Sequence, residues 1–354
     1  MKKNKIFIIA EIGVNHNGNI NLAKKLILEA KKSGADAVKF QSFTANNLAT
    51  KIAPKASYQL KNTKSKSSQF KMLKKLELQK HQYFEIKKFA KKNNIDFFTS
   101  VFDEQSLEFV QSKLNNKYIK IPSGELDNYF ILDKIKKKNF LIISTGMSSL
   151  NDIATSINRI FKKRIYELKK KDSLIINQNL LKKIKSKICV MHCVTDYPVE
   201  NKFTNLLSIP YLKNKLGVNV GYSDHTKNDT AAIASAGLGV TMIEKHFTLN
   251  KQMKGPDHKA SLEPNEFKEM VKKIRVVEEM LGSYGKEIQK CEYKNIKIAK
   301  KNIVAKNKIK KGEKFTFKNI TAKRPYGNLS PSKIDKVLGK KAKKMFNENE
   351  KIIL

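Results

Sequence analysis

Short apolar runs rich in β-branched residues recur along the chain, and stretches with helical spacing lie between them. In segment 21–34, the apolar residues share one helical face and Gly34 marks the expected end of the helix. Because strand and helix alternate eight times, the pattern predicts an α/β fold, a (β/α)8 TIM barrel rather than an open doubly wound sheet. The predicted strands are residues 6–15, 35–43, 95–102, 118–125, 140–147, 188–197, 218–225 and 240–248.

The pattern changes after residue 281, which we expect to end the barrel domain, 1–281. Residues 282–295 resemble a linker, and residues 296–354 show the short strands and glycine turns of a small β-rich domain. Two connections, 44–78 and 148–187, are too long for plain crossovers and are expected to carry insertions. The first follows a strand on the face where such barrels do chemistry, so it is either a lid or a surface excursion.

The chain is strongly basic, with 72 Lys and Arg against 32 Asp and Glu in 354 residues, a net charge of +40. Such a balance can indicate nucleic-acid binding, but the lysines are dispersed along the helices, as an AT-rich genome would produce, and no recognition motif accompanies them. No apolar run approaches the roughly 18 residues of a membrane span. The three cysteines form no CxxC pair. We therefore expect a cytoplasmic protein that binds neither nucleic acid nor membrane.

Polar side chains recur at the predicted carboxyl ends of the strands, where barrels of this type build their active sites. In "GYSDHT", Ser223 and His225 share one face, whereas Asp224 falls on the other and is expected to orient the loop or a neighbouring ligand. Any one of these residues alone could be a satisfied core group, but their recurrence favours an active site. The inward candidates are Glu11, Lys39, Gln41, Ser100, Lys120, Ser123, Glu125, Ser144, Ser223, His225, Glu244 and His246.

These residue types indicate an anionic substrate beside a metal ion. His225 and His246 end adjacent strands, so their imidazoles could bind one divalent ion, with manganese or magnesium favoured over structural zinc. A lysine inside a barrel could instead form a Schiff base with a keto acid, which would make a metal-free aldolase. A cationic pocket for phosphate and carboxylate is predicted from Lys39, Lys120, Ser100, Ser123, Ser144 and Ser223.

Several longer motifs occur in order along nearly the whole chain: "AEIGVNHNG", "KIPSGE", "STGM", "GYSDHT", "IEKHFTL", "GPDHKASLEP" and "KRPYGNLSP". Together they resemble the bacterial sialic acid (N-acetylneuraminate) synthase family, which includes legionaminic acid synthases. The resemblance implies a TIM barrel followed by a small antifreeze-like (SAF) domain. It also implies a domain-swapped homodimer and a divalent metal, Mn²⁺ with Mg²⁺ or Co²⁺ as alternatives.

The resemblance further implies a transferase that condenses phosphoenolpyruvate with N-acetylmannosamine to give N-acetylneuraminate and phosphate. The alternative substrate is 2,4-diacetamido-2,4,6-trideoxymannose, which would give N,N'-diacetyllegionaminate. Carbon 3 of phosphoenolpyruvate would attack the sugar aldehyde, water would add to carbon 2, and phosphate would leave by C–O cleavage.

By motif position, the resemblance also assigns roles to individual residues. His225 and His246 correspond to the metal ligands, and Glu125 to a catalytic carboxylate that acts with Lys39 and Lys120. The phosphoenolpyruvate contacts correspond to Lys39, Ser100, Lys120, Ser123, Ser144, Thr195 and Ser223, where Thr195 replaces an asparagine of some members and Ser100 a threonine of others. The sugar contacts correspond to Glu11, Gln41, Tyr197, Asp257 and Arg324, the last across the dimer interface.

Overall fold

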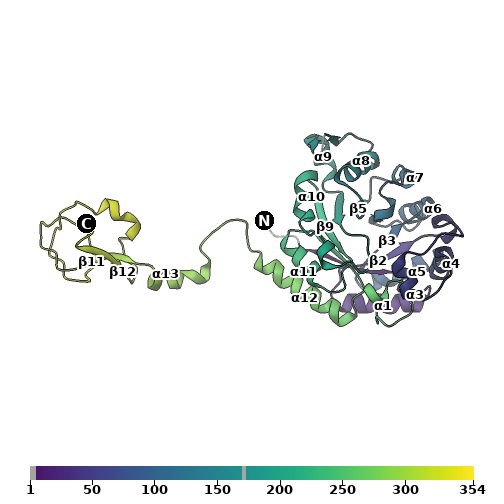
Figure 1. Ribbon diagram of the computed structural model, residues 1–354, viewed down its shortest axis with the longest axis horizontal. Helices are drawn as coiled ribbons and strands as arrows, with labels where there is room; N and C mark the ends of the chain where they lie inside the picture. The colour runs from purple at the N-terminus through teal and green to yellow at the C-terminus, as the bar shows by residue number, and fades with distance from the viewer. Residues whose placement is uncertain (1–4, 170–172) are drawn as a thin grey trace. The chain divides into compact units, whose positions relative to one another are not determined.

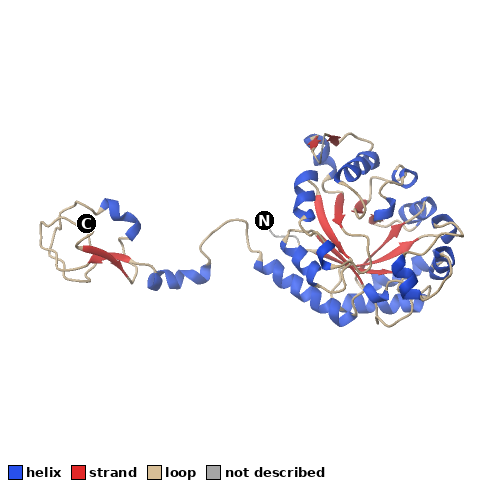
Figure 2. Cartoon of the chain, viewed as in Figure 1, coloured by secondary structure: helices blue, strands red, loops and turns tan. Residues whose placement is uncertain are grey.

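The computed structural model describes residues 5–169 and 173–354, which form two compact units, one that ends at Gly282 and one that spans Ser283–Leu354. The first unit is a closed barrel of eight parallel strands in the order β1-β10-β9-β8-β5-β4-β3-β2. Figure 1 labels β2, β3, β5 and β9 among them. Helices surround these strands (Figure 2). The predicted TIM barrel is therefore confirmed, and no helix within the described residues is long and apolar enough to cross a membrane.

All eight predicted strands are present, but several end earlier than the sequence suggests because the polar residues at their carboxyl ends belong to loops. The run 118–125, for example, gives a strand that stops at Ile121 and then a 3-10 turn, Ser123–Glu125. The barrel strands are β1 (Phe7–Gly13), β2 (Ala37–Ser42), β3 (Asp96–Val101), β4 (Tyr118–Ile121), β5 (Phe140–Ser144), β8 (Ile188–His192), β9 (Asn219–Asp224) and β10 (Met242–His246).

Helices connect the strands and cover the outside of the barrel. In the first of them, Asn19 caps the N-terminus by accepting hydrogen bonds from Asn21 N–H and Leu22 N–H, and Gly34 follows the helix with a positive φ of 88°. The connecting helices are α1 (Ile20–Lys32), α5 (Lys80–Lys92), α6 (Glu104–Glu108), α7 (Tyr129–Leu132), α8 (Leu150–Phe161), α10 (Ser208–Leu216), α11 (Thr230–Gly237) and α12 (Pro264–Met280).

Both long connections carry the expected insertions. Segment 44–78 contains three helices, α2 (Ala45–Leu48), α3 (Ser57–Thr63) and α4 (Gln69–Leu76). Segment 148–187 adds an antiparallel pair, β6 (Tyr166–Leu168) and β7 (Leu174–Ile176), and the helix α9 (Gln178–Ile184) to the connecting helix α8.

The barrel interior changes from apolar to polar along the strands. Near the amino ends, side chains such as Ile9, Phe98 and Ile142 form a closed apolar cluster inside the barrel. Two residues further on, most strands place a polar side chain on the same face because side chains alternate with a period of two, whereas β8 continues the apolar cluster with Met191. The interior is thus sealed at one end, and its polar groups gather at the other.

Asp224 lies outside this interior, as the alternation predicts. Its carboxylate binds the fully buried Lys245 at 2.8 Å and accepts a hydrogen bond from Thr226 N–H. Lys245 also donates to the carbonyl oxygens of Thr226 and Asn228, at 2.6 and 2.7 Å. The pair therefore fixes the loop that follows His225, which is the supporting role expected for Asp224.

The second unit has its own small core. A helix, α13 (Tyr293–Ala299), begins within the stretch that resembled a linker. It precedes the antiparallel pair of β11 (Asn302–Ala305) and β12 (Ile320–Lys323). The core residues are Ile303, Ala305, Ile309, Phe315, Ile320, Val337, Ala342, Phe346 and Ile352.

The burial of His16, in the loop after β1, predicts that the free energy of unfolding depends on pH. Its ring is buried and its Nδ1 accepts a hydrogen bond from Gly18 N–H at 3.0 Å, and burial lowers its pKa from 6.5 to about 4. Because the unfolded chain then binds the proton more readily, the stabilisation is complete above pH 6.5 and is lost as the pH falls towards 4. We expect His16→Asn to reduce the loss of unfolding free energy between pH 7 and pH 5 by about 2 kcal/mol in urea titrations. Parallel pH dependences for the two proteins would contradict this.

Candidate active site

A cavity of about 570 Å³ opens at the carboxyl ends of the barrel strands. Thirteen of the fifteen residues to which the sequence assigned a role line it, and all thirteen come from the barrel unit. They are Glu11, Lys39, Gln41, Ser100, Lys120, Ser123, Ser144, Thr195, Tyr197, Ser223, His225, His246 and Asp257.

Four buried charges form a continuous chain across the floor of this cavity. Lys39 Nζ lies 2.8 Å from Glu11 Oε2 and 3.6 Å from Glu244 Oε1, and Lys120 Nζ lies 3.0 Å from Glu244 Oε2. Ser223 donates to Glu244 Oε1 at 3.0 Å. Glu244 therefore holds both lysines in place, a role that the sequence did not assign, although alternation had put it on the same face as His246.

The four buried groups on the cavity floor shift one another's pKa values. Burial opposes the charged form of Glu244, but Lys120 and Lys39 outweigh it and lower its pKa to about 2. Burial likewise opposes the charged form of Lys39, yet the carboxylates of Glu11 and Glu244 raise its pKa. At Glu11, burial prevails over Lys39 and raises the pKa to about 7. Lys39 is thus held as an ammonium group, and Glu244 fixes the position of Lys120 beside it, which is the preorganisation that an anion-binding floor requires.

The two imidazoles lie side by side, with ring centroids 5.7 Å apart. His225 Nδ1 donates to Val194 O at 2.6 Å, so its Nε2 carries the lone pair. His246 Nδ1 is buried without a hydrogen-bond partner. Burial lowers the pKa of His225 to about 4 and that of His246 well below 6.5, which leaves both rings neutral at pH 7.

A ring nitrogen without a partner, beside a second imidazole whose Nε2 carries its lone pair 3.4 Å from Ser223 Oγ, fits a divalent cation, because metal-ligating histidines are neutral and use one ring nitrogen. Such a site would have only two strong protein ligands, His225 and His246. Within residues 5–169 and 173–354, no three His, Cys, Asp or Glu side chains are grouped so as to hold a metal ion.

Small side chains and backbone meet on the β4, β5 and β8 side of the cavity. Ser123 Oγ accepts a hydrogen bond from Gly146 N–H at 3.0 Å and lies 3.2 Å from Cys193 Sγ. A Cβ at Gly146 would come within 2.1 Å of Thr195 Oγ1 and 2.9 Å of Ser123 Oγ. Only glycine therefore allows these hydroxyls to converge.

Gly146→Ala is expected to raise the KM for a phosphate-bearing substrate roughly tenfold or more, because the added carbon displaces both hydroxyls. Steady-state kinetics with the anionic substrate varied would measure this. Gly237→Ala is the matched control, since nothing lies within 4 Å of its added carbon. An unchanged KM in Gly146→Ala would exclude these hydroxyls from substrate binding.

Segment 44–78 covers part of the cavity, so the surface-excursion alternative is wrong. Tyr58 on α3 packs its ring 5.1 Å from that of Tyr197, which in turn lies 4.2 Å from the His225 ring. Asn62 Nδ2 donates to Pro256 O at 2.6 Å, next to Asp257. Helix α3 thus forms a roof that connects to the loop after β10.

Two assigned residues are not brought into the lining. Glu125 lies on the 3-10 turn after β4, where Asn128 Nδ2 donates to its Oε2 at 2.6 Å and burial raises its pKa. Arg324 belongs to the second unit, where its Nε donates to Ala299 O at 2.9 Å.

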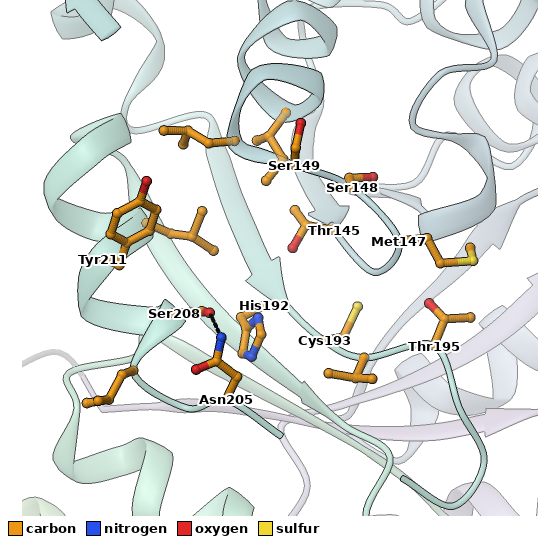
Figure 3. Close-up of a pocket in the computed structure, with 15 residues that line it drawn as sticks. Thr145, Met147, Ser148, Ser149, His192, Cys193, Thr195, Asn205, Ser208 and Tyr211 are labelled. Carbon is orange, nitrogen blue, oxygen red and sulfur yellow. Dashed lines mark hydrogen bonds between the residues drawn. The ribbon is translucent and has the colours of Figure 1, made fainter. Parts of the chain in front are cut away.

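A second pocket, of about 890 Å³, adjoins this site and shares Met147 and Thr195 with it (Figure 3). Its polar groups are mostly engaged with the protein: His192 Nε2 bonds Thr204 O at 2.8 Å, and Asn205 donates to Ser208 at 2.9 Å. Among the described residues that line it there is no lysine, arginine or carboxylate. The larger pocket therefore lacks the charged groups that distinguish the first.

Comparisons with known proteins agree with this geometry. Residues 26–286 match the NeuB family, and residues 301–352 match the SAF domain. The chain is 44% identical to the N,N'-diacetyllegionaminic acid synthase of Campylobacter jejuni, over 98% of this chain and 99% of that protein. It is 38% identical to the N,N'-diacetyllegionaminic acid synthase of Legionella pneumophila, over 94% of this chain and 89% of that protein.

Among solved structures, the N-acetylneuraminic acid synthetase of Leptospira borgpetersenii superposes with a TM-score of 0.68 at 29% identity. The match covers 83% of this chain and 90% of that one. Together, the matched family, the confirmed barrel and the convergent polar cavity show that this chain belongs to the NeuB family of synthases, which are condensing enzymes of the transferase type, and that it carries a SAF domain.

Proposed function

We propose that this enzyme condenses phosphoenolpyruvate with 2,4-diacetamido-2,4,6-trideoxymannose to give N,N'-diacetyllegionaminate and phosphate. The observation that carries the proposal is the buried floor of Lys39 and Lys120 beside two neutral imidazoles. The choice of sugar is supported by the two relatives named as N,N'-diacetyllegionaminic acid synthases, at 44% and 38% identity. N-acetylmannosamine, the first expectation from the sequence, becomes the second candidate, supported by the 29% identical Leptospira synthetase.

In this mechanism the floor binds the substrate's anionic groups. Lys39 and Lys120 neutralise the carboxylate and phosphate of phosphoenolpyruvate, and the hydroxyls near Gly146 donate to the phosphate oxygens. As carbon 3 attacks the sugar aldehyde and water adds to carbon 2, the same groups stabilise the phosphate that leaves. Because the donors are already in place, little reorganisation accompanies the reaction.

His225 and His246 would hold a divalent ion, Mn²⁺ with Mg²⁺ or Co²⁺ as alternatives, which supplies Lewis-acid polarisation of the aldehyde oxygen. Glu11 accepts a hydrogen bond from Gln41 at 3.2 Å and faces the sugar together with Asp257. We propose Glu125 as the base that activates water, although its carboxylate is not part of the cavity lining.

A Schiff-base aldolase fits the floor less well. An amine must lose its proton to attack a carbonyl, and the carboxylates around Lys39 favour the protonated form. Borohydride with pyruvate is expected to leave the protein unlabelled.

The substrate assignment is tested by phosphate release from phosphoenolpyruvate with each sugar, and by the mass of the product. We expect kcat/KM to be at least roughly tenfold higher for the diacetamido sugar than for N-acetylmannosamine. Equal values, or a preference for N-acetylmannosamine, would contradict the proposal.

We also propose a domain-swapped homodimer that works in the cytoplasm, in which Arg324 of one subunit binds the sugar's N-acetyl group at the other barrel. The three cysteines, none of them in a disulfide, support a reducing compartment. Co-expression of His225→Ala with Arg324→Ala tests the swap, because each mixed dimer regains one intact site. About a quarter of wild-type activity is expected, because about half of the dimers are mixed and each of these has one intact site out of two. If the co-expressed variants stayed inactive, the domain swap would be excluded.

A further inference from the structure

The cavity has two chemically different sides. One carries the charges and hydroxyls described above, and the other is an apolar wall that belongs to a separate small hydrophobic cluster. The wall residues are Val14, Leu48, Met72, Leu73, Leu76 and Phe102, all of which line the cavity.

One face of helix α4 makes most of this wall. Gln69, Met72, Leu73 and Leu76 follow the i, i+3, i+4, i+7 spacing of a single helical stripe, and all four line the cavity. Met72, Leu73 and Leu76 are 7 to 8% exposed, and the cavity is a surface that all three line. The stripe thus presents three apolar side chains and one amide to whatever the cavity holds.

The barrel order places the Phe102 end of this wall across the barrel from His225. In the closed ring of eight strands, β3 is separated from β9 by four steps in either direction. Phe102 directly follows β3, and His225 directly follows β9. A sugar whose aldehyde lies at His225 and whose chain crosses the cavity therefore reaches the wall at Phe102 with its other end.

The two candidate sugars differ at that other end. N-acetylmannosamine has hydroxyl groups on carbons 4 and 6, whereas the trideoxy sugar has an acetamido group on carbon 4 and a methyl as carbon 6. A hydroxyl against apolar side chains loses its hydrogen bonds to water without replacement, while a methyl gains contacts. The acetamido group brings an apolar methyl together with an amide, for which Gln69 offers a partner.

We infer that the α4 stripe and Leu48 form the specificity pocket for the deoxygenated end of the sugar, with Met72, Leu73 and Leu76 against its methyl groups. This inference rests on the proposed function. The inference names the residues that select between the two sugars. Neither the strand-end motifs nor the anion-binding floor accounts for that selection.

The test compares both sugars on wild type, Met72→Gln, Leu73→Asn and Leu48→Gln. Discrimination by one methyl group in an apolar pocket is worth roughly 10- to 200-fold. We therefore expect the ratio of kcat/KM for the trideoxy sugar to that for N-acetylmannosamine to fall at least roughly tenfold in each variant. The KM for phosphoenolpyruvate should stay the same.

The ratio is measured on one preparation, so the fraction of folded enzyme cancels. Leu48 is only partly buried, and Leu48→Gln therefore keeps the test open if a substitution on α4 prevents folding. Phe43→Leu is the control, since Phe43 belongs to the same hydrophobic cluster but does not line the cavity, and its ratio should match wild type.

The outcomes separate the two proposals. If wild type prefers the trideoxy sugar and the variants keep that preference, the proposed function stands and the specificity pocket is overturned. If wild type shows no preference, both are overturned. A preference that disappears in the variants but not in Phe43→Leu supports both.

Discussion

Lys120→Met is expected to lower kcat/KM for phosphoenolpyruvate by roughly 100- to 1,000-fold, because it removes one of two preorganised charges from the cavity floor. The ammonium group is fully buried, and its partner Glu244 Oε2 is 3.0 Å away. The loss should appear in kcat as well as in KM, since the charge also stabilises the phosphate that leaves. Steady-state kinetics with phosphate detection measures both.

The same substitution should also destabilise the fold, because Glu244 keeps only the longer of its two lysine contacts, 3.6 Å to Lys39, besides the hydrogen bond from Ser223. A loss of about 3 kcal/mol in unfolding free energy is expected. The double variant Lys120→Met with Glu244→Gln removes both charges and should regain stability while activity stays low. If activity returned together with stability, the role of Lys120 would be structural. Lys117→Met is the matched control, since the Lys117 ammonium lies over the Tyr118 ring, 4.8 Å from its centroid, and does not line the cavity.

His246→Ala is expected to abolish tight binding of Mn²⁺ and to lower turnover by at least about 100-fold, because a Lewis acid lowers the barrier by several kcal/mol. The physical reason is the buried Nδ1 that has no protein partner, next to a second ring whose tautomer is fixed by Val194 O. Titration of Mn²⁺ followed by electron paramagnetic resonance measures binding without reference to activity.

His81→Ala serves as the control for that experiment, because His81 lies at the exposed start of α5. His225→Ala should behave like His246→Ala. Retention of wild-type Mn²⁺ affinity in either cavity variant would rule out the two-histidine metal site.

The sequence by itself determined the barrel and the polar side chains at the ends of its strands that face the cavity. Both follow from local regularities: eight alternations of strand and helix, and the two-residue period that puts Ser223 and His225 on one face and Asp224 on the other. The same period identified Lys39 and Lys120 as inward residues. Such patterns depend only on neighbours along the chain, so they can be followed without the fold.

The tertiary structure alone decided how those residues act on one another. Glu244 becomes the link between two lysines because the closed barrel brings it to Lys120, 124 positions away in the sequence. Segment 44–78 becomes a roof and an apolar wall because its helices pack over strands β1 to β3. Glu125 leaves the lining because a 3-10 turn interrupts the alternation after β4. Each result depends on contacts between distant segments, which no local period encodes.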